Sequence, residues 1–367
     1  MIGSIIVFLI VLSILILVHE LGHFFAARRM GVWVEEFGLG IPPRAWGKKI
    51  RETIYSLNWL PFGGFVRLHG ENEDDKVTKP EKSFRHKSKK ARALIISAGV
   101  LMNFALAVVA FGIVYSFTGV PRESGKITVI GVSDGTPAAV SGIAENDQVL
   151  EVDGLTVSST DEFTGAIADK LDQEVTLTVV SDTGEKTVSL VPRSDHPNDE
   201  GPVGFVIISS ENYYPPLLLR PLYGIYYGFK EAIFWMLLVL RTFVMIFQSL
   251  LGGEVPAGIS GPVGIYALTT EAASFGVLSL INFVGILSVN LMILNILPIP
   301  ALDGGRLLFI GFETLFGRKI VPKVENYLHI GGFVLLILIL VLITISDVTR
   351  LVTAGGVSGF LDSFTAP

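Results

Sequence analysis

Cysteine is absent from this 367-residue sequence, and its absence excludes disulfide bonds and thiolate metal ligands. Any zinc site must therefore use His, Asp or Glu. Without disulfides, the sequence also gives no indication of the redox compartment. Charge is scarce as well, since Asp, Glu, Lys and Arg make up 17% of the residues, against about a quarter in soluble domains. An ordinary soluble globular protein is thereby excluded.

Apolar residues take the place of the missing charge. They make up 50% of the sequence, and the mean hydropathy is +0.59. We therefore predict an α-helical membrane protein with about four transmembrane helices. Their expected bounds are 4–27, 93–117, 278–300 and 330–346. The length leaves room for an inserted soluble domain.

The net charge of −6 conceals an uneven distribution of basic residues. Residues 28–92 carry fifteen Lys or Arg against eight Asp or Glu, whereas residues 122–200 carry five against sixteen. Because basic loops remain in the cytoplasm, the first segment is predicted to be cytoplasmic and the second extracytoplasmic.

A metal-binding pattern lies at the end of the first apolar run, where the sequence reads His19-Glu20-Leu21-Gly22-His23. Residues four apart share one helix face, so His19 and His23 can hold one Zn²⁺ while Glu20 acts as a general base. Ionisable groups at membrane depth are costly. This cost favours a functional role over histidines that merely reach toward the surface.

A later apolar run ends in polar residues that suit the same site. Asn290 and Asn295 are followed by Pro298, Pro300 and Asp303. Zinc in hydrolases usually has three protein ligands, and Asp303 is the candidate third ligand because it lies at the end of a span at the same expected depth. The prolines break the helix before it. A simple Asp-Gly turn is the alternative role.

Residues 32–69, between the first two spans, are rich in Gly, aromatic and β-branched residues, which indicates short strands and turns. Apolar, non-helical backbone next to a membrane-depth site is tolerated only when it packs on protein or lines a cavity. We therefore expect a re-entrant β element on the cytoplasmic side. An ordinary cytoplasmic hairpin is the alternative.

Residues 118–216 are predicted to form an inserted α+β domain with a core at 125–192. The succession of Thr136 to Ala139, Gly142-Ile143 and Asp147 to Gly154 resembles a PDZ domain of the bacterial type. Asn146 replaces the usual Gly before Asp147, and Asn also tolerates positive φ. PDZ domains bind extended chain ends by strand addition. A small β domain without a peptide partner is the alternative.

Residues 217–276 allow two interpretations. The part from 217 to 251 is apolar but is interrupted by Arg220, Lys230, Glu231 and Arg241, and a Gly/Pro loop follows it. A further crossing and an interfacial segment both fit this pattern. A single crossing would leave Asp303 on the opposite side from the histidine pair. We therefore expect one or two amphipathic helices along the outer membrane surface.

The order of these elements resembles the site-2 protease family of intramembrane zinc metalloproteases, of the bacterial regulator of sigma-E protease type. The resemblance rests on His19 to His23, on Gly99 to Asn103, on the PDZ-like domain and on Asn290 to Gly304. It covers nearly the whole chain. Its most specific feature is Asn-x-x-Pro-x-Pro-x-x-Asp-Gly together with His-Glu-x-x-His. The single PDZ-like domain is a departure, since some family members carry two.

This resemblance implies a multi-pass enzyme of the bacterial inner membrane that cleaves single transmembrane helices of membrane-protein substrates, such as anti-sigma factors or remnant signal peptides. It implies Zn²⁺ held by His19, His23 and Asp303, with Glu20 as the catalytic base. The PDZ-like domain is expected to contact substrate ectodomains or chain ends, and no nucleic-acid partner is expected. The implied substrate contacts come from Asn295, Asn290, Gly63, Gly64, Phe65 and Val66.

Two other classes of protein stay open. An inactive homologue would act as a membrane scaffold that presents a PDZ-like domain, but it gives no reason to keep both metal motifs. An intramembrane proton or ion pathway would also explain buried His, Glu and Asp residues. Such a pathway needs polar residues along several spans, whereas here they gather at two helix ends.

Overall fold

The computed structural model describes residues 2–71, 76–182, 184–197, 200–252, 260–317, 322–356 and 359–360. The chain divides into two compact units. Residues 118–220 form the second unit, and the chain before and after them forms the first.

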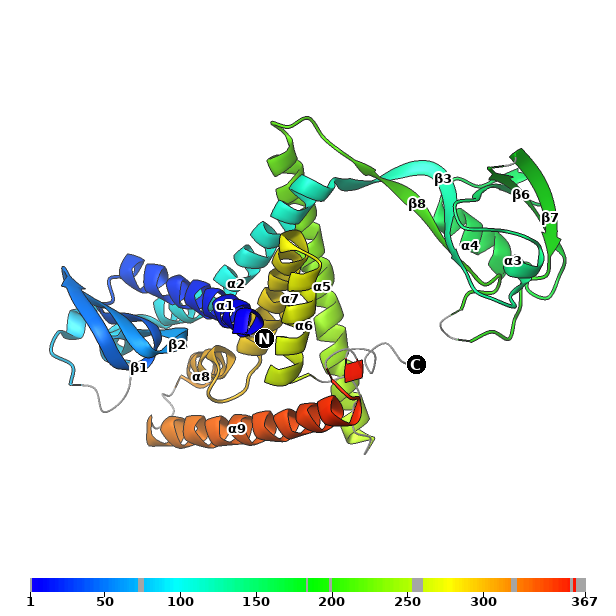
Figure 1. Cartoon of the computed structure of the whole chain (residues 1–367). Helices are drawn as coiled ribbons and strands as arrows, with labels where there is room; N and C mark the ends of the chain where they lie inside the picture. The colour runs from blue at the N-terminus through cyan, green and yellow to red at the C-terminus, as the bar shows by residue number, and fades with distance from the viewer. Residues whose placement is uncertain are drawn as a thin grey trace. The chain divides into compact units, whose positions relative to one another are not determined.

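Among the described residues of the first unit, five helices are long and apolar enough to cross a membrane, where the sequence predicted four. These are α1 Ile2–Arg29, α2 Lys89–Thr118, α5 Arg220–Leu251, α7 Val277–Ile296 and α9 Pro322–Thr353. The shorter helices α6 Pro262–Ser274 and α8 Asp303–Phe316 lie among them, as do the 3₁₀ turns η1 Pro80–Lys82 and η2 Phe84–His86 (Figure 1).

Helix α5 is one uninterrupted helix that runs antiparallel to α2. Its Gly224 and Gly228 approach Gly112 of α2 so closely that a methyl group at Gly224 would meet the Gly112 carbonyl oxygen at 2.3 Å. Small residues four apart allow such contact between membrane helices. Further along, the rings of Phe229 and Phe104 pack edge to face. This packing fixes the first half of α5 against α2.

Helices α6 and α7 form a helical hairpin and lie side by side (Figure 1). Gly276, with φ of 107°, provides the left-handed residue at the turn between them. The 13 residues of α6 span about 20 Å at 1.5 Å per residue. This length is shorter than the hydrocarbon core of a membrane, about 30 Å, and α6 is not among the five helices long enough to cross it.

Helix α9 is anchored to the start of α6 by a buried carboxylate. Asp347 Oδ2 accepts hydrogen bonds from the backbone N–H groups of Gly261 (2.8 Å) and Gly264 (3.0 Å). Asp347 is fully buried, and it satisfies donors that the first turn of a helix leaves unpaired.

The predicted β region forms an antiparallel pair, β1 Val34–Ile50 and β2 Thr53–Leu68. The first part of β1 pairs on both of its sides. Leu39, for example, lies opposite Leu57 in one half of β2 and opposite Gly64 in the other half. The end of β2, residues 64–68, therefore forms an edge of this sheet, because among the described residues it pairs with β1 alone.

A buried cluster joins this sheet to the helices. It contains residues from the end of α1, the sheet, η2, the start of α2, and α8. Its members are Phe24, Ala27, Val32, Val34, Leu68, Phe84, Ile95, Ile96 and Ile310. Its burial fixes the edge strand against α1, so the strand has a defined position relative to the residues that α1 carries.

The second unit contains one sheet with the strand order β7-β6-β4-β3-β8, and β5 pairs with β4 off this path. Asn146 has φ of 71°, as expected for the position where it replaces Gly. Strand β8 lies outside the predicted core of 125–192, and it pairs with β3 from Val120 opposite Tyr213 onward. The elements are β3 Val120–Val132, α3 Pro137–Val140, β4 Gln148–Val152, β5 Leu155–Thr156, α4 Thr160–Ala168, β6 Val175–Ser181, β7 Gly184–Leu190 and β8 Phe205–Tyr213.

Candidate metal centre

Three side chains that the sequence singled out meet in the first unit. His19 and His23 lie one turn apart on α1, with their Nε2 atoms 3.1 Å from each other. Asp303 Oδ2 lies 3.1 Å from His19 Nε2 and 3.2 Å from His23 Nε2. Both histidines are buried. The structure therefore brings together residues that are 280 positions apart in the sequence.

The break after α7 places Asp303. Helix α7 ends at Ile296, and α8 begins at Asp303 itself. Between them, Ala301 takes a φ of 80°, and its N–H donates to His329 Nδ1 at 2.9 Å. A methyl group at Gly304 would meet the Leu297 carbonyl oxygen at 2.1 Å. Glycine thus allows the turn to fold tightly enough to direct Asp303 at the histidines.

A close approach of α1 and α2 completes the wall of the site. A Cβ atom at Gly22 would meet the Ala98 carbonyl oxygen at 2.3 Å, and one at Gly99 would meet His23 Nε2 at 2.5 Å. Only glycine fits at these two positions without a shift of backbone or ligand. The absence of a side chain at Gly99 therefore leaves room for the imidazoles.

Each histidine has a partner for its second ring nitrogen. His23 Nδ1 lies 2.9 Å from the Ile95 carbonyl oxygen, an acceptor, so Nδ1 carries the proton and Nε2 presents its lone pair. His19 Nδ1 lies 3.3 Å from Asn103 Nδ2, while Asn103 Oδ1 is buried without a partner. Exchanging the two amide atoms of Asn103 would give Oδ1 an N–H donor and free His19 Nε2 in the same way.

The three ligand atoms fit a zinc ion. Zinc bonds of about 2.0–2.1 Å at tetrahedral angles separate two ligand atoms by about 3.3 Å. The observed separations of 3.1 to 3.2 Å are close to this value. Asp303 Oδ2 is buried with no hydrogen-bond donor, as expected of an oxygen that is available to a cation. Two nitrogens and one oxygen are also a common zinc-hydrolase ligand set.

A cavity of about 290 Å³ opens beside these ligands, and Glu20 lies in its wall. The edge strand supplies Phe65, Val66 and Leu68 to the same cavity, and Asn295 lines it from α7. The strand runs close to Glu20, since a Cβ atom at Gly64 would lie 3.9 Å from Glu20 Cγ.

Two further predicted substrate contacts, Gly63 and Asn290, lie in different surroundings. Gly63 belongs to the same strand, where its Cβ position would touch Ile16 at 3.6 Å and Ile41 at 3.8 Å. Asn290 does not line the cavity; its amide donates to the Ile286 carbonyl oxygen one turn earlier in α7. The structure therefore brings Asn295 to the site and leaves Asn290 within its own helix.

Two cavity residues escaped the sequence analysis. Glu71 and Arg306 form an ion pair in the cavity wall, which joins the segment after β2 to α8. A Glu at the start of a short acidic run and an Arg after a span carry no local pattern that predicts such a pair, because the pairing depends on the long-range fold.

Comparison with known proteins agrees with this chemistry. The sequence profile of peptidase family M50 matches residues 7–339. A Clostridium perfringens protein named provisionally as a zinc metalloprotease is 34% identical over 346 residues, which cover 93% of this chain and 97% of the relative. The zinc metalloprotease RasP of Oceanobacillus iheyensis is 27% identical over a gapped alignment of 442 positions, which covers 95% of this chain and 99% of RasP.

A helical unit with candidate membrane spans and a His-His-Asp group that could hold a metal ion is typical of a membrane metallohydrolase. The profile match extends over most of the chain, and the chain belongs to peptidase family M50, the site-2 proteases. It is an intramembrane zinc metalloprotease.

Proposed function

We propose that this protease cleaves single transmembrane helices at a zinc site formed by His19, His23 and Asp303, with Glu20 as the catalytic base. The observation that carries the proposal is the triangle of ligand atoms, 3.1 to 3.2 Å apart, beside a strand edge with no protein partner among the described residues. When bound, zinc supplies a Lewis acid that polarises the scissile carbonyl and makes water nucleophilic near neutral pH.

The carboxylate of Glu20 moves the proton in this scheme. It lies in the cavity wall beside the ligands, so it can take a proton from the attacking water and pass it to the leaving amine. Asn295, in the same wall, can donate its amide N–H to a substrate carbonyl. His19, His23 and Asp303 hold their positions because glycines allow their helices to pack closely.

The edge strand holds the substrate. A transmembrane helix conceals its carbonyl groups, so a substrate must unwind before it is cut. Residues 64–67 lie at an edge and have β1 as their one strand partner among the described residues. An extended substrate can pair with this edge and leave none of its own polar groups bare in lipid. Large apolar side chains such as Trp46, Leu57 and Trp59 are exposed on this sheet, which supports its placement within the membrane.

The proposed orientation follows from charge. The basic residues 28–92 would lie in the cytoplasm, and the acidic second unit would lie outside. There the second unit, which we propose to be a PDZ-like domain, would meet substrate ectodomains or chain ends. By resemblance to the family, anti-sigma factors and remnant signal peptides are the proposed substrate classes.

The test is Glu20→Gln in the full chain. The variant should keep its zinc, measured by metal analysis, while cleavage of a single-span reporter falls by at least ~10²-fold because proton transfer is lost. His19→Ala serves as the contrast, since it should lose both zinc and cleavage. Cleavage by Glu20→Gln at the wild-type rate would overturn the assignment of the base.

A further inference from the structure

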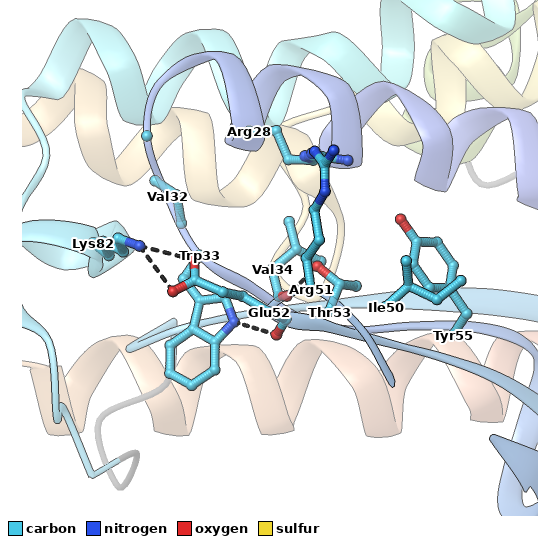
Figure 2. Close-up of a pocket in the computed structure, with 11 residues that line it drawn as sticks. Arg28, Val32, Trp33, Val34, Ile50, Arg51, Glu52, Thr53, Tyr55 and Lys82 are labelled. Atoms are coloured by element: carbon cyan, nitrogen blue, oxygen red, sulfur yellow. Dashed lines mark hydrogen bonds and ion pairs between the residues drawn. The ribbon is translucent and has the colours of Figure 1, made fainter. Parts of the chain in front are cut away.

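A second and larger cavity, of about 660 Å³, lies in the first unit between the end of α1 and the turn that joins β1 to β2 (Figure 2). It shares no lining residue with the catalytic cavity. Its walls combine the basic side chains of Arg28, Arg51 and Lys82 with the rings of Trp33 and Tyr55. The proposed peptidase chemistry uses none of these groups.

Two arginines in this cavity have no counter-charge. Arg28 stands in the last turn of α1, and Arg51 stands in the turn between the strands. Their side chains extend toward one another (Figure 2). In the described part of the chain, no carboxylate lies within ion-pair distance of either guanidinium. Both side chains are exposed, so water screens their mutual repulsion, and an anion between them would remove it.

The acidic residue in the wall does not supply that anion. Glu52 pairs with Lys82 at 2.8 Å and with Lys79 at 3.1 Å. Hydrogen bonds from Lys82 and then Lys79 lower the pKa of the Glu52 carboxyl group, so it stays ionised and committed to the lysines. Its backbone carbonyl accepts from Trp33 Nε1 at 2.6 Å. The cavity therefore keeps a positive excess.

The backbone conformation of Arg51 is a second observation on this cavity. Ile50 pairs with Thr53, so Arg51 and Glu52 form a two-residue turn, and Arg51 takes a φ of 57°. Turns of this length favour Gly or Asn at such a position because a side chain costs free energy there. Arg51 departs from this preference, so the turn presents a long basic side chain to the cavity.

We propose that this cavity binds the phosphate group of an anionic ligand between Arg28 and Arg51. The planar guanidinium groups match phosphate oxygens in pairs, and Tyr55 provides an apolar surface for the rest of the ligand. The α1 candidate span ends at Arg29, which is the depth at which phospholipid headgroups lie. A lipid headgroup and a soluble phosphate share this chemistry, and the binding measurements separate them.

The variant that tests the site is Arg51→Gly. Glycine adopts a φ of 57° without steric cost, so this variant should be at least as stable as the wild type. Arg29→Gln is the matched control, because Arg29 is adjacent in the same helix turn but does not line the cavity. Zinc content and the thermal midpoint establish that all three proteins are folded.

Two measurements on the full chain identify the source of the phosphate. Native mass spectrometry compares the retention of phosphatidylglycerol with that of phosphatidylcholine, and calorimetry in detergent measures the binding of inorganic phosphate. We expect wild type and Arg29→Gln to retain phosphatidylglycerol in preference, and Arg51→Gly to lose about tenfold or more in affinity.

Each outcome decides the proposal. Loss of inorganic phosphate binding alone in Arg51→Gly supports the site with a soluble ligand as its occupant. Equal binding of both probes by wild type and Arg51→Gly overturns the site. An equal loss in Arg29→Gln also overturns it, since that result would indicate general surface charge.

Discussion

At the scale of single residues, the orientation of the ligands depends on groups that do not touch a metal. Asn103 is fully buried, and its amide faces His19 Nδ1. Partners of this kind fix the ring and the tautomer of a ligating histidine.

We predict that Asn103→Leu weakens zinc binding by about 10–100-fold, the usual effect of losing such a partner. The ring of His19 would lose its acceptor while keeping its place on α1. Titration with a zinc chelator measures the affinity. Asn103→Asp, which keeps an acceptor oxygen, should retain more affinity than the leucine variant. Wild-type affinity in Asn103→Leu would show that His19 needs no such support.

The sequence predicts the three ligand residues and Glu20, because a helical repeat and a carboxylate at the end of a later span are local signals. It does not predict the partner of His19. Asn103 lies 84 positions from His19, and an amide in an apolar helix fits many roles. The ion pair of Glu71 and Arg306 and the meeting of Arg28 with Arg51 are likewise products of the long-range fold.

At the scale of elements, the edge strand is the feature on which substrate binding depends. Proline removes a backbone donor from a strand. We predict that Val66→Pro lowers cleavage of a single-span reporter by about tenfold or more, since one backbone hydrogen bond and the strand geometry are lost, while zinc content stays near one ion per chain.

The control for this prediction is Lys48→Pro. Lys48 pairs with Tyr55 on the far side of the sheet, so cleavage should be little affected there. Equal loss of zinc and cleavage in Val66→Pro would indicate misfolding and would argue against a role in substrate pairing.

Hydropathy alone indicates α1, α2, α7 and α9, because a long apolar run predicts a membrane-spanning helix whatever the rest of the fold. The sequence does not predict that β1 pairs on both sides, since the alternation of apolar and polar residues along a strand is the same whether the strand has one neighbour or two. Helix α5 was harder to assign because its interrupting charges suggest a surface. In the structure, Glu231 accepts hydrogen bonds from Tyr115 and Trp235, which makes this acidic residue tolerable within a bundle.

At the scale of the whole molecule, the length of α5 and its packing along α2 lead us to predict that α5 crosses the membrane, which requires the chain between α5 and α7 to return to the outer side. Single cysteines at Leu218 and Gly252 should then react with an impermeant thiol reagent from opposite sides. The chain has no native cysteine to interfere. Labelling of both positions from outside would restore the surface position that the sequence predicts.

Two markers calibrate this labelling experiment. Asp134→Cys reports the side of the second unit, and Lys90→Cys reports the side of the basic loop. We expect them to react from outside and inside respectively. Both markers on one side would contradict the proposed orientation.

The pairing of Val120 with Tyr213 has a consequence for how this lineage can change. The chain enters and leaves the second unit at neighbouring positions, because Val120 and Tyr213 are paired. The residues between them therefore behave as an insertion whose two ends are adjacent. Enlarging such a loop adds little closure entropy, and insertions succeed at sites of this kind. Domains can therefore be gained, duplicated or deleted here by recombination, while the two flanking segments that form the catalytic unit are inherited unaltered.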